Sequence, residues 1–359
     1  LINSLMTTNL KLNTVNIGEK TIGPGHPCMI IAEAGVNHNG SQQAALELVD
    51  VAHDAGADAV KFQLYSKDEQ VSKLARTADY QHRNTGFDTV LELAEMYEMP
   101  WECHHAIAAH CRELGIIYMA SCFDKQAVNF LLGLGGDCIK VGSGEITNYP
   151  LLRHMSSTGK TIILSTGMST LSDVKGAFEH IRSHGESEVV LLQCVSNYPA
   201  SASSTNLLVM DTYTKEFGVN VGFSDHTIGS TVAVAAVTMG ACIIEKHFTI
   251  DKGLQGPDHA MSLGPDELRD FVSTIREAED SIGDGEKVVH SDELEIQKVS
   301  RRSIFTSRFI PAGERIDINN VTFKRPNVGI DPRLLTDVLG RVVMKDLDVD
   351  TPITWDLLT

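Results

Sequence analysis

Charged and hydroxyl side chains follow several short apolar runs of the sequence, at the point where each run ends. Lys61 and Lys140 lie at two of these ends, and Ser143, Ser165 and Ser224 lie at or just beyond others. Lysine supplies positive charge and a serine hydroxyl supplies a directional hydrogen bond, so together they suit a ligand with a phosphate and a carboxylate. Serine and glycine at a strand end also serve turn geometry. Their joint occurrence with two lysines nevertheless predicts an anion site, and phosphoenolpyruvate is an anion that suits it.

Two histidines occupy the same kind of position. His226 ends a Ser-Asp-His sequence, and His247 follows Glu245 by two residues. Two imidazoles at neighbouring strand ends are able to share one divalent cation, with water completing its shell. Imidazole with water and carboxylate neighbours suits Mn, with Mg or Co as alternatives, better than a closed structural zinc. Three other histidines are instead predicted on the surface of a helix: His104, His105 and His110.

Two carboxylates are further candidates. Glu33 lies within an apolar run, where a carboxylate is costly unless it has a partner. We therefore predict that Glu33 holds a substrate hydroxyl or moves a proton. Asp258 follows Gly256 and Pro257 in a predicted loop, where it would reach a sugar hydroxyl or the water on the metal, although an Asp in such a turn also serves as a cap.

The elements that position these residues follow from the apolar runs, which alternate with longer amphipathic segments between residues 29 and 282. This alternation is typical of parallel strands joined by helices. Eight such strands close a barrel, and the active site of a barrel lies at the carboxyl ends of its strands. Since no G-x-G-x-x-G sequence follows the first run, an open doubly wound sheet is disfavoured. The predicted fold is an α/β (β/α)8 TIM barrel whose strands are residues 29–33, 59–63, 116–121, 138–141, 161–165, 189–193, 219–223 and 242–246.

The pattern of elements changes after Ile282. Residues 1–282 are assigned to the barrel, with a helix expected after the N-cap candidate Ser41 and a last helix from Pro265 to Ala278. A polar linker is predicted for residues 283–299 and a small second domain for residues 300–359. Its expected strand-like pieces are residues 303–305, 310–314, 323–326 and 339–343.

Composition excludes several classes of protein. The formal net charge of -17 would repel a phosphate backbone, so nucleic acid is not an expected partner. No apolar stretch approaches the roughly 20 residues that span a bilayer, and Leu1 to Met6 lack the pattern of a signal peptide. The seven cysteines are scattered singly rather than in C-x-x-C pairs, which favours a reducing, cytoplasmic setting over a disulfide framework.

Together these motifs resemble the sialic acid synthases, the family of N-acetylneuraminate and N,N'-diacetyllegionaminate synthases. The tail resembles the antifreeze-like (SAF) domain of that family, and its Lys324-Arg325-Pro326 matches the segment that reaches the substrate. The motifs that carry the resemblance are residues 33–40 (EAGVNHNG), 61–63 (KFQ), 140–145 (KVGSGE), 164–168 (LSTGM), 222–227 (GFSDHT) and 245–249 (EKHFT).

The resemblance implies an enzyme that condenses phosphoenolpyruvate with N-acetylmannosamine, or with a 2,4-diacetamido-6-deoxy-mannose analogue, to give a nonulosonic acid and phosphate. It also implies a domain-swapped homodimer, in which the SAF domain of one chain covers the active site of the other. His226 and His247 would hold the metal. The other implied site residues are Glu33, Lys61, Lys140, Glu145 and Glu245 as the charged shell, and Gln63, Ser121, Ser143, Ser165, Ser196, Tyr198, Ser224, Asp258 and Arg325 of the partner subunit as substrate contacts.

The sequence departs from the family pattern at Ala120–Phe123, where many members have Ser-Thr-Pro-Phe, and at Ser196, which replaces a frequent Asn. Three other functions are considered. A related synthase that takes a phosphorylated sugar would need a second basic cluster, which the sequence lacks. A pyruvate aldolase would form a Schiff base on Lys61, Lys140 or Lys246. The SAF-like tail alone would also suit a non-catalytic carbohydrate-binding protein.

Overall fold

The computed structural model describes residues 12–359, so the prediction for Leu1 to Met6 lies outside the described residues. The chain divides into two compact units, Leu1–Gly283 and Asp284–Thr359. Each unit is described by itself below.

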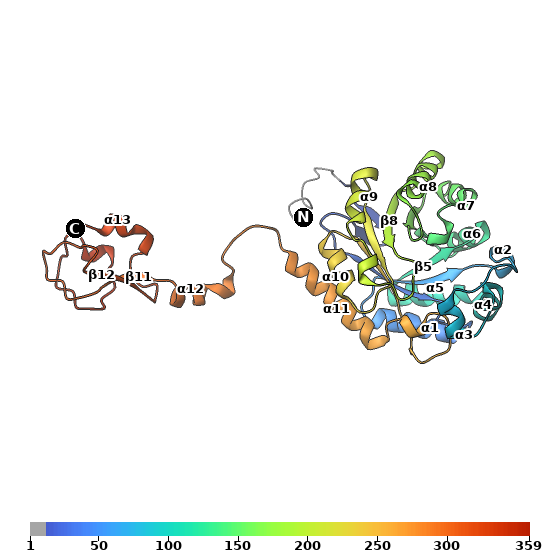
Figure 1. Cartoon of the computed structure of the whole chain (residues 1–359), viewed down its shortest axis with the longest axis horizontal. Coiled ribbons are helices and arrows are strands. Elements are labelled where there is room, and N and C mark those ends of the chain that lie inside the picture. The colour runs from blue at the N-terminus through green and yellow to red at the C-terminus, as the bar shows by residue number, and fades with distance from the viewer. Residues whose placement is uncertain (1–11) are drawn as a thin grey trace. The chain divides into compact units, whose positions relative to one another are not determined.

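The first unit contains a closed barrel of eight parallel strands, which confirms the predicted fold. Each strand pairs with the next along the chain, and the last pairs with the first. Figure 1 shows the helices surrounding these strands. The barrel strands are β3 (Met29–Gly35), β4 (Ala59–Leu64), β5 (Ile117–Cys122), β6 (Cys138–Val141), β7 (Thr161–Ser165), β8 (Val189–Cys194), β9 (Val221–Asp225) and β10 (Ile243–His247).

Helices connect the strands as expected, and their ends carry the predicted signals. Ser41 caps the first helix, because its hydroxyl accepts a hydrogen bond from the Ala44 N–H. The last helix begins at Pro265, as expected, and continues to Ile282 rather than ending at Ala278. The helices of this unit that join barrel strands, or follow the last of them, are α1 (Gln42–Asp54), α5 (Cys103–Leu114), α6 (Lys125–Gly133), α7 (Tyr149–Ser156), α8 (Leu171–His184), α9 (Val209–Phe217), α10 (Thr231–Thr238) and α11 (Pro265–Ile282).

A long insertion precedes α5. It contains three short helices, α2 (Lys67–Gln70), α3 (Asp79–Thr85) and α4 (Val90–Tyr97). Leu93, Ala94 and Tyr97 pack with Val36 and Tyr65 in a separate small apolar cluster. The insertion is thereby held beside the carboxyl ends of β3 and β4.

An unpredicted hairpin belongs to the amino end of the barrel. Strands β1 (Val15–Ile17) and β2 (Lys20–Ile22) pair antiparallel. Their buried side chains join barrel residues such as Met29, Ile31 and Ile243 in one apolar cluster. That end of the barrel interior is therefore filled with apolar side chains, which leaves the carboxyl end for polar groups.

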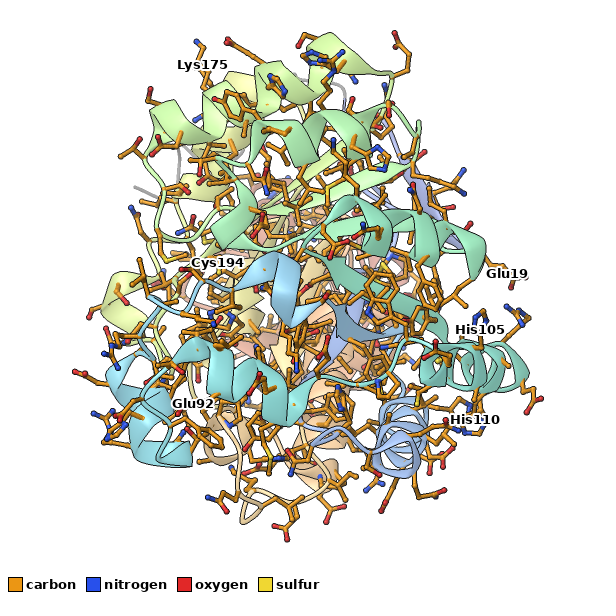
Figure 2. The ribbon with its side chains drawn as sticks, turned by 90° about the vertical axis from the view of Figure 1, so that its right-hand side faces the viewer. Glu19, Glu92, His105, His110, Lys175 and Cys194 are labelled. Atoms are coloured by element: carbon orange, nitrogen blue, oxygen red, sulfur yellow. The ribbon has the colours of Figure 1, made fainter. Side chains whose placement is uncertain are left out.

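The histidine prediction is wrong for one residue of α5. His104 is buried, and its Nδ1 lies 2.9 Å from the Tyr118 hydroxyl of β5. In Figure 2, His105 and His110 lie on opposite sides of the same helix. His105 is exposed, as predicted, whereas His110 is half-buried, with its Nε2 2.6 Å from Asp50 Oδ1 of α1. A buried His104 is held neutral, since burial lowers its pKa to about 3.

The second unit contains one two-stranded sheet, formed by β11 (Ser303–Thr306) and β12 (Val321–Lys324). The expected pieces at 310–314 and 339–343 do not form strands, because Ile310 and Val343 make only isolated bridges to other loops. A short helix, α13 (Leu335–Val338), precedes the latter piece. The segment predicted as a linker contains a 3₁₀ turn at Ser291–Glu293 and a helix, α12 (Leu294–Ser300).

Within residues 12–359, no helix combines the length and the apolar character needed to cross a bilayer. All seven cysteines are free thiols.

The substitution Gly222→Ala in β9 tests how tightly the barrel wall is packed. A Cβ at this position would lie 2.5 Å from the Ile243 carbonyl oxygen and 2.7 Å from Leu192 Cδ2. We expect Gly222→Ala to lower the free energy of unfolding by about 1–3 kcal/mol, because the clash includes backbone. Urea unfolding monitored by circular dichroism measures this change. Gly133→Ala at the exposed end of α6, where a Cβ has open space, is the matched control, and equal stabilities of the two variants would contradict the prediction.

Candidate active site

A cavity of about 430 Å³ opens at the carboxyl ends of the barrel strands. Nearly every strand contributes a polar side chain to this cavity. Every second residue of a strand points to the same face, so pairs such as Lys61 and Gln63 both reach it. The predicted site residues that line it are Glu33, Lys61, Gln63, Ser121, Lys140, Ser143, Ser165, Ser196, Tyr198, Ser224, His226, Glu245, His247 and Asp258.

Four buried charges of alternating sign lie side by side at the base of this cavity. Lys61 Nζ is 2.7 Å from Glu33 Oε2 and 3.7 Å from Glu245 Oε1. Lys140 Nζ is 3.8 Å from Glu245 Oε2. Burying an ion costs several kcal/mol unless a partner of opposite charge offsets the cost, so the four groups depend on one another.

The pKa values of the four groups differ with their neighbours. Burial raises the pKa of Glu33 to about 7, although Lys61 opposes it. Burial also acts to raise the pKa of Glu245, but Lys140 and Lys61 outweigh it, and the pKa falls below its ordinary value. The pKa of Lys61 rises, since Glu245 and Glu33 outweigh the effect of burial, whereas burial lowers the pKa of Lys140. Near neutral pH, Glu33 is therefore the carboxylate able to exchange a proton.

Each of the two lysines donates a hydrogen bond to a serine hydroxyl. Lys61 Nζ donates to Ser121 Oγ at 2.9 Å, and Lys140 Nζ donates to Ser165 Oγ at 2.7 Å. Each serine accepts through oxygen and keeps its own O–H free to donate to a ligand. Ser143 Oγ likewise accepts from the Gly167 N–H at 2.9 Å. The result is a set of donors suited to a phosphate or a carboxylate.

His226 and His247 are the two cavity residues that could hold a metal ion. Their ring centroids are 5.6 Å apart. His226 Nδ1 lies 2.7 Å from the Val195 carbonyl oxygen, which can only accept, so Nδ1 carries a proton and Nε2 is the nitrogen left for a ligand bond. Burial acts to lower the pKa of His226, but Cys194 and the Val195 carbonyl outweigh it and raise the pKa above its ordinary value, so a cation would have to displace a proton from this ring. His247 Nδ1 is buried with no hydrogen-bond partner among the described residues. Burial also lowers the pKa of His247 well below its ordinary value, which keeps the ring neutral, as a ligand must be.

The protein offers two imidazoles rather than a closed cage. Among residues 12–359, no three His, Cys, Asp or Glu side chains converge as a metal centre. Glu245 Oε2 is also buried without a hydrogen-bond partner in that part of the chain. A cation held by His226 and His247 would therefore take its remaining ligands from water or substrate, which leaves positions open for chemistry.

The remaining lining of the cavity combines carboxylates with aromatic rings. Gln63 Nε2 donates to Glu33 Oε1 at 3.4 Å. Burial raises the pKa of Asp258 to about 6. The rings of Tyr80 and Tyr198 are 5.3 Å apart, and Tyr198 also lies 4.1 Å from the His226 ring. A sugar would find both hydroxyl partners and flat apolar faces there.

Two predicted site residues lie elsewhere. Glu145 is part of the 3₁₀ turn Ser143–Glu145 after β6, where its Oε2 accepts from Asn148 Nδ2 at 2.7 Å. It does not line the cavity, and it holds the turn that carries Ser143 instead. Arg325 is exposed in the second unit, directly after β12, so its approach to a substrate stays a prediction.

The predicted set missed several cavity residues, among them Cys194 and Tyr80. Cys194 ends β8, and its Sγ lies 3.8 Å from His226 Nδ1; the rule used for the other strand ends would have found it. Tyr80 comes from α3 of the insertion, and the sequence contains no signal that brings this helix to the cavity.

Comparison with known proteins gives the same assignment for both units. The model of the NeuB family matches residues 48–287, and that of the SAF domain matches residues 301–359. An N,N'-diacetyllegionaminic acid synthase of Legionella pneumophila is 42% identical over 98% of this chain and 99% of its own length. One of Campylobacter jejuni is 38% identical over 90% of this chain and 97% of its own. The crystal structure of an N-acetylneuraminic acid synthetase from Leptospira borgpetersenii, in complex with citrate, superposes with a TM-score of 0.72 at 30% identity, over 80% of this chain and 96% of that one.

The substitution Gly167→Ala tests whether the donors around Ser143 bind an anion. A Cβ here would lie 2.9 Å from Ser143 Oγ and closer still to Ser196 Oγ. Gly167→Ala should displace both hydroxyls and weaken the binding of inorganic phosphate by about tenfold, which is about 1.4 kcal/mol. Isothermal titration calorimetry measures this affinity, and the thermal unfolding midpoint shows whether the fold is kept. Unchanged phosphate affinity in a folded variant would mean that the donors around Ser143 do not bind the anion.

Proposed function

The chain belongs to the NeuB family, and on that premise we propose that it is a nonulosonic acid synthase that joins phosphoenolpyruvate to an amino-sugar aldehyde. The observation that carries this proposal is the convergence of Lys61, Lys140 and their serines with His226 and His247 in one cavity. The lysines and serines are suited to bind the phosphate and carboxylate of phosphoenolpyruvate. The histidines are suited to hold a cation that activates the carbonyl of the sugar aldehyde.

Phosphoenolpyruvate would bind along the lysine side of the cavity. Lys140 with Ser165, and Lys61 with Ser121, present ammonium and hydroxyl donors 2.7–2.9 Å apart within each pair. Such donors bind the ground-state anion and also stabilise charge as it moves onto the departing phosphate. The lysines and serines are thus proposed to hold the substrate and then the leaving group.

The metal proposed for the site is Mn, with Mg or Co as alternatives, held by His226 and His247. When bound, a divalent cation supplies Lewis-acid polarisation of the sugar aldehyde. Two observations support this assignment: His247 Nδ1 is buried without a hydrogen-bond partner among the described residues, and the contact of His226 Nδ1 with the Val195 carbonyl leaves Nε2 as the nitrogen for a ligand bond.

In the proposed reaction, carbon 3 of phosphoenolpyruvate attacks the aldehyde carbon of the open-chain sugar. Water then adds at carbon 2, and the resulting tetrahedral intermediate expels phosphate as the carbon–oxygen bond breaks. Protons must leave the water and reach the new hydroxyl. Glu33, with a pKa of about 7 and a contact to Gln63, is placed to hold or move such a proton.

The acceptor is proposed to be N-acetylmannosamine or a 2,4-diacetamido-6-deoxy-mannose analogue, and the product N-acetylneuraminate or a legionaminate. Asp258, Gln63 and the Tyr80–Tyr198 pair offer the mixture of hydroxyl partners and apolar faces that an N-acyl sugar requires. Similarity to two N,N'-diacetyllegionaminic acid synthases supports the diacetamido sugar.

We also propose that the protein works as a homodimer in the cytoplasm. In this arrangement the second unit of one chain covers the cavity of the other and contributes Arg325. The exposure of Arg325, with its neighbour Lys324 paired to Asp350 at 2.6 Å, leaves the guanidinium available for such a contact.

One observation favours a second candidate. Burial lowers the pKa of Lys140, as in lysines that form Schiff bases. A pyruvate aldolase would be trapped covalently by borohydride in the presence of pyruvate, whereas a metal-dependent synthase would be stopped by a chelator.

The function is tested by phosphate release with Mn, phosphoenolpyruvate and three sugars. These are N-acetylmannosamine, its 6-phosphate and the 2,4-diacetamido-6-deoxy sugar. Release with an unphosphorylated N-acyl sugar supports the proposal. Release with the 6-phosphate alone would contradict the proposed acceptor, and no release with any sugar would favour a non-catalytic carbohydrate-binding protein.

Loss of either histidine should abolish turnover. His226→Ala and His247→Ala each remove one of two protein ligands, so we expect phosphate release to fall by at least about a hundredfold, since metal sites depend on every ligand. EDTA should inhibit the unaltered chain, and added Mn should restore it. His53→Ala on the surface of α1 is the control. Near-normal activity of either cavity variant would rule out the metal assignment.

Arg325→Ala should chiefly raise the KM for the sugar, because its guanidinium is proposed to contact that substrate. Steady-state kinetics with each substrate varied in turn separates this effect from a change in the KM for phosphoenolpyruvate. Arg333→Ala, an exposed arginine of the same unit paired with Asp331, is the control. An unchanged KM for the sugar would show that Arg325 does not contact it.

A further inference from the structure

A buried ion pair lies on the outer side of the barrel wall, directly behind the two histidines. Lys246 Nζ is 2.8 Å from Asp225 Oδ2, and the two side chains are only 3% and 0% exposed. They are direct partners in the register of β10 with β9. His247 is the next residue of β10, and His226 directly follows the end of β9.

The pair faces away from the cavity. Side chains alternate along a strand, and Glu245 and His247 line the cavity whereas Lys246 does not. Lys246 Nζ instead lies 5.7 Å from the ring centre of Phe271 on α11, outside the barrel. The ion pair and the histidines therefore occupy opposite faces of the same two strands.

Further hydrogen bonds fasten the residues on both sides of His226. Lys246 Nζ also donates to the Thr227 carbonyl oxygen. Asp225 Oδ1 accepts from the Thr227 N–H at 2.8 Å and from its hydroxyl at 2.7 Å. The three-residue segment 225–227, with His226 at its centre, is thus tied to the strand that carries His247.

Stability alone does not explain this arrangement. A buried ion pair is often matched or exceeded in stability by apolar residues of the same volume, because removing two charges from water is costly. What apolar residues would not supply is directional bonding to both neighbours of His226. Groups that orient metal ligands in this way commonly change metal affinity by 10- to 100-fold.

We propose that Asp225 and Lys246 are positioning residues that fix the separation of the His226 and His247 imidazoles for a divalent cation. The proposal rests on the proposed function, since it takes these two histidines as the metal ligands. It assigns a role to a lysine and a carboxylate that do not touch the substrate.

The test measures Mn²⁺ affinity without substrate, from the electron paramagnetic resonance signal of free Mn²⁺. Lys246→Met leaves Asp225 buried and unpaired, so both stability and affinity should fall. The double variant Asp225→Asn with Lys246→Met buries no unpaired charge. Its urea midpoint should recover toward that of the unaltered chain, while its Mn²⁺ affinity should stay about tenfold or more weaker.

Lys252 and Glu267 provide the matched control. They form an ion pair of the same types at 2.9 Å in the loop and helix after β10, with side chains 45% and 51% exposed. Lys252→Met with Glu267→Gln should leave Mn²⁺ affinity within about twofold, because exposed pairs contribute little.

Three outcomes contradict the proposal. A folded double variant with Mn²⁺ affinity within about twofold of the unaltered chain refutes the positioning role and leaves the proposed function intact, provided that the unaltered chain binds Mn²⁺ and releases phosphate. A double variant as unstable as Lys246→Met alone would show that the ion pair itself stabilises the fold, which contradicts the premise that stability does not explain it. An unaltered chain that binds no Mn²⁺ refutes the metal assignment together with this inference.

Discussion

The burial of four alternating charges at one end of the barrel is the constraint on which the site depends. Glu33, Lys61, Glu245 and Lys140 are each taken out of water, and each is tolerated only because a neighbour offsets its charge. Strand register supplies those neighbours, since Glu33 lies opposite Lys61 in the pairing of β3 with β4. A slip of one residue would send Lys61 to the outer face of the barrel. The register that closes the barrel therefore also brings these four charges together.

Strands β3 and β10 each have an apolar half at the amino end and a polar half at the carboxyl end. On the inner face of β3, Met29 and Ile31 belong to the apolar cluster at the amino end, and Glu33 reaches the cavity two residues later. β10 repeats this order, with Ile243 followed by Glu245 and His247. The apolar half provides the free energy that holds the barrel together. In the polar half, the hydroxyls of Ser121 and Ser165 are positioned by hydrogen bonds from Lys61 and Lys140.

Two features of the sequence account for most of the correct predictions: the spacing of the apolar runs, and the polar residues at the end of each run. The apolar runs located all eight barrel strands to within a few residues, and the polar residues that follow them line one cavity. The failures have physical causes. Tyr80 reaches the cavity through packing of the insertion, which no local pattern encodes. His104 is buried because it packs against the rings of Phe62 and Tyr118, which belong to other elements. Glu145 follows a strand end as the other candidates do, but the 3₁₀ turn directs it to Asn148.

We propose that this cavity breaks the carbon–oxygen bond of phosphoenolpyruvate while joining it to an N-acyl amino sugar. Phosphoenolpyruvate labelled with ¹⁸O at the bridging oxygen tests this reaction, by mass spectrometry of the phosphate and the sugar acid formed. We expect the label to leave with phosphate and the sugar acid to contain all three carbons of phosphoenolpyruvate. Label retained at carbon 2 of the product, or a product formed equally well from pyruvate, would contradict it.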